Sequence, residues 1–386
     1  MTQRTWLIAC RAAVLLAVLA GTAAAGPREQ AKRMHDRLAG VPPSDAVLTA
    51  MQADIAANRP LDAAYIAMAN PSFYNVTLKN FVAPWTNRDR SVFVPLNDYI
   101  ATVVGMIHED VPFNTVLSAD ILYVGAPSLG LPPYSASNND HYAQMEARGL
   151  DLMTGLQRTT QSSLTGLPPA ATAGVMTTRA AAEAFFVAGT NRAMFRFTLL
   201  NYMCNDLEQV MDTSLPPDRI RQDVSRSPGG DSRLFLNNCI GCHSGMDPMA
   251  QAFAYYNFDE ASGRIEYTPG QVQPKYFHND ANFPFGFRTP DDSWDNYWRE
   301  GQNSFLGWDE SLPGSGNGAK SLGVELASSD AFASCQVKKV FRAVCLRPPE
   351  DAADRAQVSQ MASLFESGGY NMRQTFARAA VYCMGQ

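Results

Sequence analysis

The stretch Cys239-Ile240-Gly241-Cys242-His243 is the most informative part of this 386-residue sequence. C-x-x-C-H is the attachment signature of a c-type haem. Two cysteines three positions apart lie on adjacent turns of a short helix, where each thiol can form a thioether with one haem vinyl group. The next residue, His243, would supply its imidazole as the proximal iron ligand. The sequence therefore predicts one haem c, held covalently by Cys239 and Cys242 and ligated by His243.

The sequence around the motif favours haem over the alternatives. Residues 231–238 place Leu234 and Phe235 one turn ahead of Cys239, as in a helix that enters a small haem domain. A zinc site needs four ligands, and no second C-x-x-C or H-x-H pair occurs in the chain. A thioredoxin-type C-x-x-C follows a strand in a βαβ pattern, and no such alternation surrounds the motif. Another metal and a chance match are the remaining alternatives.

The first residues predict export. Arg4 and Arg11 precede an apolar run over residues 12–20, and Ala23-Ala24-Ala25 resembles a cleavage site. This pattern is that of a secretory signal peptide cleaved near Ala25, and its apolar run is too short to span a membrane. Attachment of haem at C-x-x-C-H takes place outside the bacterial cytoplasm. We therefore expect a periplasmic or secreted protein, and no later stretch reaches the roughly 20 apolar residues of a transmembrane helix.

The net charge of the chain favours one kind of binding partner and argues against another. Without Arg4 and Arg11, 29 of the 31 basic residues remain against 37 acidic residues, a net charge of −8. An acidic surface argues against nucleic acid and permits docking to a basic redox protein. The sequence thus predicts that the protein binds a redox partner protein, whose identity is unknown, and that it does not bind nucleic acid. It leaves the oligomeric state open.

The cysteine pattern predicts two disulfides. Four cysteines remain beyond the leader and the haem motif, namely Cys204, Cys335, Cys345 and Cys383. In an oxidising compartment four such thiols are expected to pair. Cys335 and Cys345 share one predicted helix over 332–346, where ten residues separate them by about 15 Å. A disulfide tolerates only about 7 Å between Cα atoms, so each must pair with Cys204 or Cys383 unless the thiols are free.

The apolar spacing predicts a mainly α-helical chain. Ser44 is expected to cap one helix, and Asp247-Pro248 to begin another as N-cap and first helical residue. Residues 71–90 and 126–140 are predicted as irregular segments. The predicted helices cover residues 28–38, 44–57, 61–69, 94–109, 111–124, 177–211, 247–258, a segment capped by Asp291, 320–328, 332–346 and 351–383. The predicted domains are a signal peptide (1–25), a helical N-terminal domain (26–212), a linker (213–230) and a cytochrome c-like haem domain with C-terminal helices (231–386).

The motif and the residues that follow it carry a family resemblance. The haem motif, Met246-Asp247-Pro248 and Asn257-Phe258-Asp259 together resemble the planctomycete-type cytochrome c-like proteins. Residues 111–123 are similar to the upstream helical domain of that family, and residues 321–342 to its C-terminal domain. The resemblance covers most of residues 90–380. It implies an exported monohaem protein with flanking helical domains of unknown function, and it implies no substrate.

The second axial ligand of the iron decides the chemistry. Methionine or histidine there gives a six-coordinate electron carrier, whereas an open position permits peroxide or gas chemistry. His278 lies 35 residues after His243 and is the candidate distal ligand, with an exposed loop histidine as the alternative. Met246 and Met249 follow His243 too closely to reach the opposite haem face. The other candidates are Met361, Met372 and Met384, and we expect His35, His108 and His141 at the surface.

These observations predict an exported monohaem c-type cytochrome that transfers electrons, a redox carrier rather than a turnover enzyme. The first alternative is a haem enzyme or sensor with an open distal site, similar to a peroxidase. The second is a binding protein in which the haem is structural, since about 200 residues lie outside the haem domain. No catalytic residues can be assigned from spacing.

Overall fold

The chain is mainly helical, as the sequence predicts. The computed structural model describes residues 25–187, 189–220, 232–276 and 287–385. The predicted signal peptide therefore falls outside the described residues, except for its last position. In the described ranges, no helix has both the length and the apolar character needed to cross a membrane.

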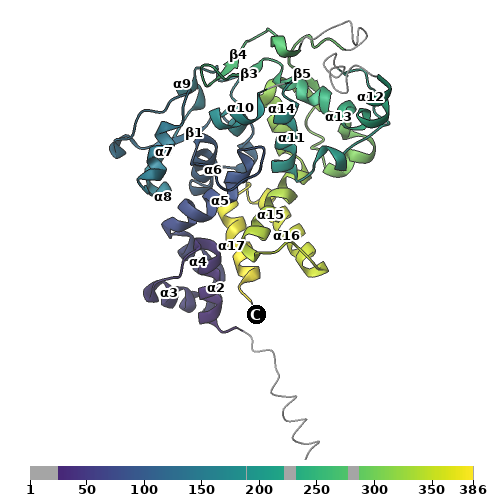
Figure 1. Cartoon of the computed structure of the whole chain (residues 1–386). Coiled ribbons are helices and arrows are strands. Elements are labelled where there is room, and N and C mark those ends of the chain that lie inside the picture. The colour runs from purple at the N-terminus through teal and green to yellow at the C-terminus, as the bar shows by residue number, and fades with distance from the viewer. Residues whose placement is uncertain (1–24, 188, 221–231, 277–286, 386) are drawn as a thin grey trace, which may run out of the picture.

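The two ends of the chain form one lobe, at the bottom of Figure 1. The first helices are α2 (Pro27–Ala39), α3 (Asp45–Ala56) and α4 (Pro60–Met68), and the last are α15 (Asp330–Cys345), α16 (Ala352–Ser367) and α17 (Met372–Cys383). Helix α17 contacts α2, α4 and α15. Arg33 and Arg37 of α2 donate hydrogen bonds to the carbonyls of Met384 and Cys383, at 2.8 and 2.6 Å. The N-terminal and C-terminal helices thus support each other.

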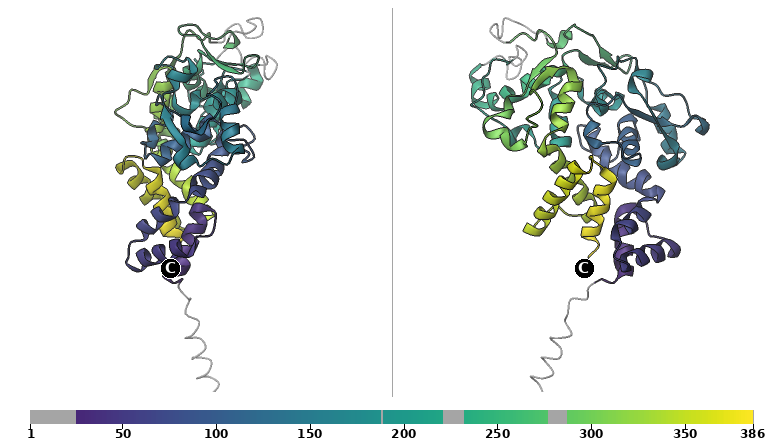
Figure 2. Two further views of the ribbon diagram at one scale, coloured as in Figure 1. Left: turned by 90° about the vertical axis from the view of Figure 1, so that its left-hand side faces the viewer. Right: turned by 180° about the vertical axis from the view of Figure 1, so that it is seen from behind.

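The remaining helices lie above this lobe (Figure 1). Helix α6 (Asp98–His108) is buried along ten of its residues, and the Asn97 side chain caps it by accepting from the Ile100 N–H at 3.0 Å. The other helices are α5 (Lys79–Val82), α7 (Asp140–Ala147), α8 (Leu152–Gly155), α9 (Gln161–Thr165), α10 (Arg179–Phe185), α11 (Arg192–Thr198), α12 (Ser232–Asn238), α13 (Ile240–Ala250) and α14 (Gly318–Ala327). In Figure 1, and seen from behind in Figure 2, α12 and α13 lie on one side of this upper part and α7 to α9 on the other.

The described residues form three antiparallel strand pairs, and the first strand of each pair lies in a segment predicted as helical. The strand pairs are β1 (Leu122–Gly125) with β2 (Leu156–Thr159), β3 (Tyr256–Asp259) with β4 (Arg264–Tyr267), and β5 (Ser293–Asp295) with β6 (Ser315–Asn317). The prediction of a helix over 111–124 is wrong, since these residues form a 3₁₀ turn at Phe113–Thr115 that is followed by β1. The helix expected after Asp291 is likewise wrong, because β5 and a 3₁₀ turn take its place.

The predicted helix over 247–258 begins and ends elsewhere. Helix α13 starts at Ile240, carries Pro248 in its last turn and stops at Ala250. In β3 the side chains of Tyr256 and Phe258 are buried, whereas those of Asn257 and Asp259 are half-buried. This alternation is the two-residue period of a strand. Gly263 closes the β3–β4 hairpin with φ +68°, and a Cβ there would lie 2.5 Å from the Ser137 carbonyl oxygen. Glycine is therefore required at this turn.

The buried apolar side chains join both predicted domains into one core. One continuous cluster runs from Ala31 in α2 to Ala380 in α17 and includes Trp298 and Met249 beside the haem motif. The proposed boundary at residues 213–230 stays a prediction, because residues 221–230 lie outside the described part of the chain.

Two disulfides involve the C-terminal helices, one to an earlier segment and one within the group. Cys204 pairs with Cys335 and Cys345 with Cys383, at Cα–Cα distances of 5.3 and 5.4 Å. This confirms that Cys335 and Cys345, which both belong to α15, each take a partner outside that helix. Because Cys383 belongs to the last helix, the second bridge closes α15 onto α17.

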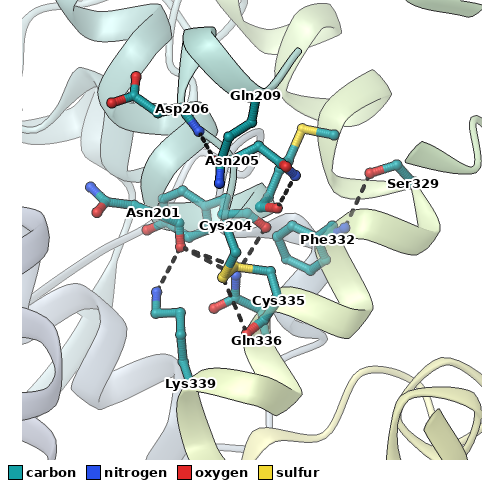
Figure 3. The surroundings of a disulfide bond; sticks show 12 residues. Asn201, Cys204, Asn205, Asp206, Gln209, Ser329, Phe332, Cys335, Gln336 and Lys339 are labelled. Atoms are coloured by element: carbon teal, nitrogen blue, oxygen red, sulfur yellow. Dashed lines mark hydrogen bonds between the residues drawn. A yellow bond between two sulfur atoms is a disulfide. The ribbon is translucent and has the colours of Figure 1, made fainter. Parts of the chain in front are cut away.

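The Cys204–Cys335 bridge anchors the segment that leads to the haem motif. Figure 3 shows this bridge with Asn201, whose carbonyl accepts from Lys339 at 2.6 Å. The Lys339 ammonium also lies 3.0 Å from the centre of the Trp85 ring. Beyond the bridge, Asp206 caps a short 3₁₀ turn, and its own N–H donates to the Gln209 side chain at 2.7 Å. Residues 201–204 are thus fixed on α15, and the capped 3₁₀ turn follows directly.

Candidate functional site

The haem motif lies at the junction of α12 and α13. Cys239 separates the two helices, and its N–H donates to the Phe235 carbonyl at 2.9 Å. The N–H groups of Cys242 and His243 both donate to the Cys239 carbonyl, at 3.2 and 3.1 Å. Cys242 and His243 therefore occupy the first turn of α13, as a short helix was expected to place them.

Both motif cysteines are free, whereas the four other cysteines of residues 25–385 form disulfides. The two thiols are half-buried. The Cys242 thiol lies 3.6 Å from the Leu207 carbonyl oxygen, in the segment anchored by the Cys204–Cys335 bridge. Burial raises the pKa of Cys242, and the nearby Glu208 carboxylate adds to the effect. A raised pKa keeps the Cys242 thiol protonated near neutral pH, so the motif presents two free thiols within one helical turn rather than a thiolate.

A buried carboxylate orients the imidazole of His243. The Asp247 side chain is fully buried one turn further along α13, and both of its oxygens lie 3.2 Å from His243 Nδ1. An ionised carboxylate can only accept hydrogen bonds, so Nδ1 carries the proton. The lone pair is then on Nε2. Metal-binding histidines usually donate their other N–H to a carboxylate or carbonyl in this way.

Arg192 at the start of α11 pairs with the same carboxylate. Its Nε and Nη2 donate to the two oxygens of Asp247 at 2.7 and 2.8 Å, a bidentate arrangement. Burial raises the pKa of Asp247, but the charge of Arg192 and the contact with His243 outweigh that effect and hold the pKa well below its usual value. Asp247 is therefore an ionised residue in the interior, held from two sides.

The position of Arg192 depends on the residue before it. Asn191 adopts φ +58°, and its side-chain amide donates to the carbonyls of Phe253 and Tyr256, both at 2.8 Å. Its side-chain oxygen accepts from Lys275 at 2.7 Å. Burial lowers the pKa of Lys275 to about 7. These contacts fix the start of α11 against the segment that follows α13.

Asn257 connects the Asn-Phe-Asp sequence to the same network. Its side-chain oxygen accepts from Lys275 Nζ at 2.8 Å, and the third acceptor of this ammonium is the Phe186 carbonyl at 2.7 Å. Phe258 is buried in the core. Asn257 and Phe258 thus act in packing around α13.

Two glycines let neighbouring segments approach α13 closely. A Cβ on Gly245 would lie 1.9 Å from the indole nitrogen of Trp298. A Cβ on Gly241 would lie 3.2 and 3.4 Å from side-chain atoms of Thr213 and Met211, and the Gly241 carbonyl accepts from the Asp212 N–H at 2.8 Å. The motif helix is therefore held on two sides by residues distant in sequence.

The surroundings of the motif fit a haem c. The Phe235 ring lies edge-on to His243 with 5.6 Å between ring centres, and Ile220 packs with Phe235 beside Cys239. Leu236 and Met211 flank the motif and are exposed by 54% and 50%. Large apolar side chains left exposed beside two thiols and one imidazole suit a group that is itself apolar and bound through those atoms.

No tetrahedral metal centre is formed by the described residues. Among them, no group of three or more His, Cys, Asp or Glu side chains is placed to hold a metal ion. A structural zinc site requires four such ligands. A haem c requires two thiols and a single protein imidazole on the proximal side. Cys239, Cys242 and His243 are the residue types of the second donor set.

The structure describes only some of the candidate distal ligands of the iron. His278 lies outside the described residues, and its role stays a prediction. Met361 and Met372 are buried in the core of α16 and at the start of α17. Met384 is half-buried at the end of the chain, where its carbonyl contacts Arg33 of α2. Helices α16 and α17, which carry Met361 and Met372, lie in the lower lobe of Figure 1, whereas α13 lies in the upper part.

The N-terminal histidines are structural. The expectation that they lie at the surface is wrong for His35 and His141, which are 1% and 5% exposed. His35 Nδ1 bonds the Val41 carbonyl at 2.8 Å, and His141 Nε2 accepts from the Gly125 N–H at 2.8 Å. His108 is half-buried with its ring edge-on to Tyr74. Hydrogen bonds to backbone groups satisfy the buried rings of His35 and His141.

Two residues of the site were not predicted from the sequence, and a third was assigned another role. Arg192 and Lys275 lie 51 residues before and 32 residues after His243, and no motif or spacing connects them to it. Asp247 was predicted as an N-cap, but it lies inside α13 and contacts His243. The spacing of four between His243 and Asp247 was the available signal, since such residues share one helical face.

Neither protein-family models, nor curated proteins, nor solved structures match this chain. The resemblance to the planctomycete-type cytochrome c-like proteins therefore rests only on the residues quoted for it.

Proposed function

We propose that this chain is an exported monohaem c-type cytochrome that transfers electrons through a covalently attached haem. One observation carries the proposal: the free thiols of Cys239, at the N-cap of α13, and Cys242, in its first turn, lie beside His243, whose Nδ1 is held by a buried carboxylate. The spacing shared with the planctomycete-type cytochrome c-like proteins adds support. The haem, once bound, would supply one-electron chemistry at its iron.

The residues of α13 would have separate roles in holding the group. The S–H of Cys239 and of Cys242 would each add across one vinyl double bond, so the sulfur and the hydrogen go to its two carbons and no oxidant is needed. His243 would bind the iron through Nε2, because Nδ1 already donates to Asp247. Phe235 and Ile220 would keep water from the cysteine side of the ring.

Export is part of the proposal. Two disulfides are the expected state of four cysteines in an oxidising compartment. The N-terminal sequence has the pattern of a cleavable leader. Covalent haem attachment belongs to the same compartment.

The site also supports a second candidate, a haem enzyme or sensor with an open distal position. The observation that favours it is the placement of Met361, Met372 and Met384, which belong to elements remote from α13. His278 is then the remaining candidate from the sequence for a sixth ligand. The two functions differ in whether an external ligand can reach the iron.

The decisive experiment is the absorption spectrum of the full chain, exported by a bacterium that matures c-type cytochromes. We expect a reduced spectrum with a sharp α-band and a haem that stays on the polypeptide in a denaturing gel. If carbon monoxide leaves the spectrum unchanged, the iron is six-coordinate and the carrier function is supported. A spectrum shifted by the gas supports the open site. Protein purified without any haem would contradict both functions.

His278→Ala sharpens the choice between them. If His278 is the sixth ligand, the variant binds carbon monoxide and the parent protein does not. His35→Ala is the matched control, because this histidine bonds a backbone carbonyl in the lower lobe. The control should keep the parent spectrum.

A further inference from the structure

The contact between Asp247 and His243 is a buried electrostatic feature with a direct connection to the proposed iron site. The Asp247 carboxylate is fully buried, and its two oxygens are equidistant from Nδ1 at 3.2 Å. A backbone carbonyl in this place would accept the same hydrogen bond without a full negative charge. A carboxylate also draws the Nδ1 proton toward itself and makes the imidazole a stronger electron donor.

The second contact of this carboxylate acts in the opposite direction. Arg192 donates to the same two oxygens at 2.7 and 2.8 Å, and its side chain is only 20% exposed. A guanidinium stays charged at all accessible pH values. It stabilises the negative charge on Asp247 and so limits how strongly the carboxylate attracts the Nδ1 proton. The donor strength of His243 is thus set by two opposing, fixed charges.

We propose that Asp247 and Arg192 form a positioning pair that sets the reduction potential of an iron bound to His243. The inference rests on the proposed function. Asp247 lowers the potential, because a more basic imidazole and a nearby negative charge favour the oxidised, more positive iron. Arg192 raises it by attenuating that donation and by adding a positive charge. Removing one member should therefore shift the potential in the direction opposite to removing the other.

The structure offers a matched control for a structural role. Arg299 donates to both oxygens of Glu325 at 2.8 Å, and these side chains are 20% and 2% exposed, against 20% and 0% for Arg192 and Asp247. Glu325 also accepts from the Asn296 side chain at 2.8 Å. Glu325 thus accepts hydrogen bonds from the side chains of Asn296 and Arg299 rather than from His243. A substitution there removes an equally buried ion pair without altering the imidazole.

The test is a spectroscopic redox titration of the exported, haem-loaded full chain at one pH. Asp247→Asn keeps an acceptor for Nδ1 but removes the charge, and we expect its potential to rise. The expected change is about tenfold in the equilibrium constant for reduction, which is about 59 mV for a one-electron couple. Arg192→Gln should lower the potential. Glu325→Gln should lose stability and leave the potential unchanged.

The outcomes separate the inference from the function on which it rests. A parent protein without haem overturns both. A haem-loaded parent whose Asp247→Asn and Glu325→Gln variants have equal potentials overturns the inference and leaves the cytochrome intact. If Asp247→Asn does not fold, Arg192→Gln decides: a lowered potential supports the pair, and an unchanged or raised potential contradicts it.

Discussion

Helices α15 to α17 and helices α12 and α13 use cysteine in different ways. In the first region each cysteine is bonded to a partner at least 38 residues away, and the bridges close α15 onto α17 and onto the segment at Cys204. In the second region two cysteines share one helical turn and stay free. The bridged cysteines restrict the chain, whereas the free ones can bond an external group. Substituting the bridged cysteines should therefore change the stability of the fold, whereas substituting the free cysteines should change the attachment of an external group.

The largest expected effect comes from removing the free thiols. In Cys239→Ala/Cys242→Ala both thioethers are lost, and we expect no haem to remain on the polypeptide in a denaturing gel stained for haem. Cys345→Ala/Cys383→Ala is the control, and it should keep the stain. Stain retained in the first variant would show that these two cysteines do not attach the group.

The bridged cysteines should affect stability instead. For Cys345→Ala/Cys383→Ala we expect a loss of about 2–4 kcal/mol in the free energy of unfolding, because the unfolded chain gains the freedom of an open loop. Urea unfolding followed by circular dichroism measures this loss. An unchanged unfolding midpoint would argue that packing of α17 against α2 and α4 already holds the lower lobe.

A smaller effect is expected where α13 meets Trp298. Gly245→Ala places a methyl group 1.9 Å from the buried indole nitrogen, and overpacking of this kind costs about 1–3 kcal/mol. Gly241→Ala is the matched variant, since its nearest side-chain atoms are 3.2 and 3.4 Å away. We expect it to be almost neutral, because alanine also favours the helix. Thermal unfolding of the two variants should separate them, and equal losses would contradict the close approach at Gly245.

The last expected effect is the contribution of Lys275 to the pH dependence of stability. Burial lowers its pKa from 10.5 to about 7, so between these values the unfolded chain holds a proton that the folded chain has lost. Stability should therefore rise with pH across this window, by about 1 kcal/mol per pH unit or less. Lys275→Met should lose this contribution, and urea unfolding at pH 7 and pH 9 measures the difference. Parallel pH profiles for the two proteins would show that Lys275 stays charged when folded.

Predictions of the disulfides succeeded because they used lengths that do not depend on the rest of the fold. A helix containing both Cys335 and Cys345 keeps them too far apart to pair, whatever surrounds it. The helix predictions failed where aromatic residues were counted without their alternation. Tyr256 and Phe258 are two residues apart with polar neighbours, a strand pattern, and Gly263 closes the turn that follows them.

The local sequence was sufficient for the helical class and the pairing rule of the cysteines, since each depends on a few residues and on helix geometry, and it also contains the C-x-x-C-H motif on which the haem proposal rests. The surroundings of His243 depended on tertiary packing. Arg192 reaches Asp247 because Asn191, Phe253 and Tyr256 fix the start of α11 beside α13. A charge-pairing contact across 55 residues leaves no periodic trace in the sequence, so it became visible only when the chain was folded.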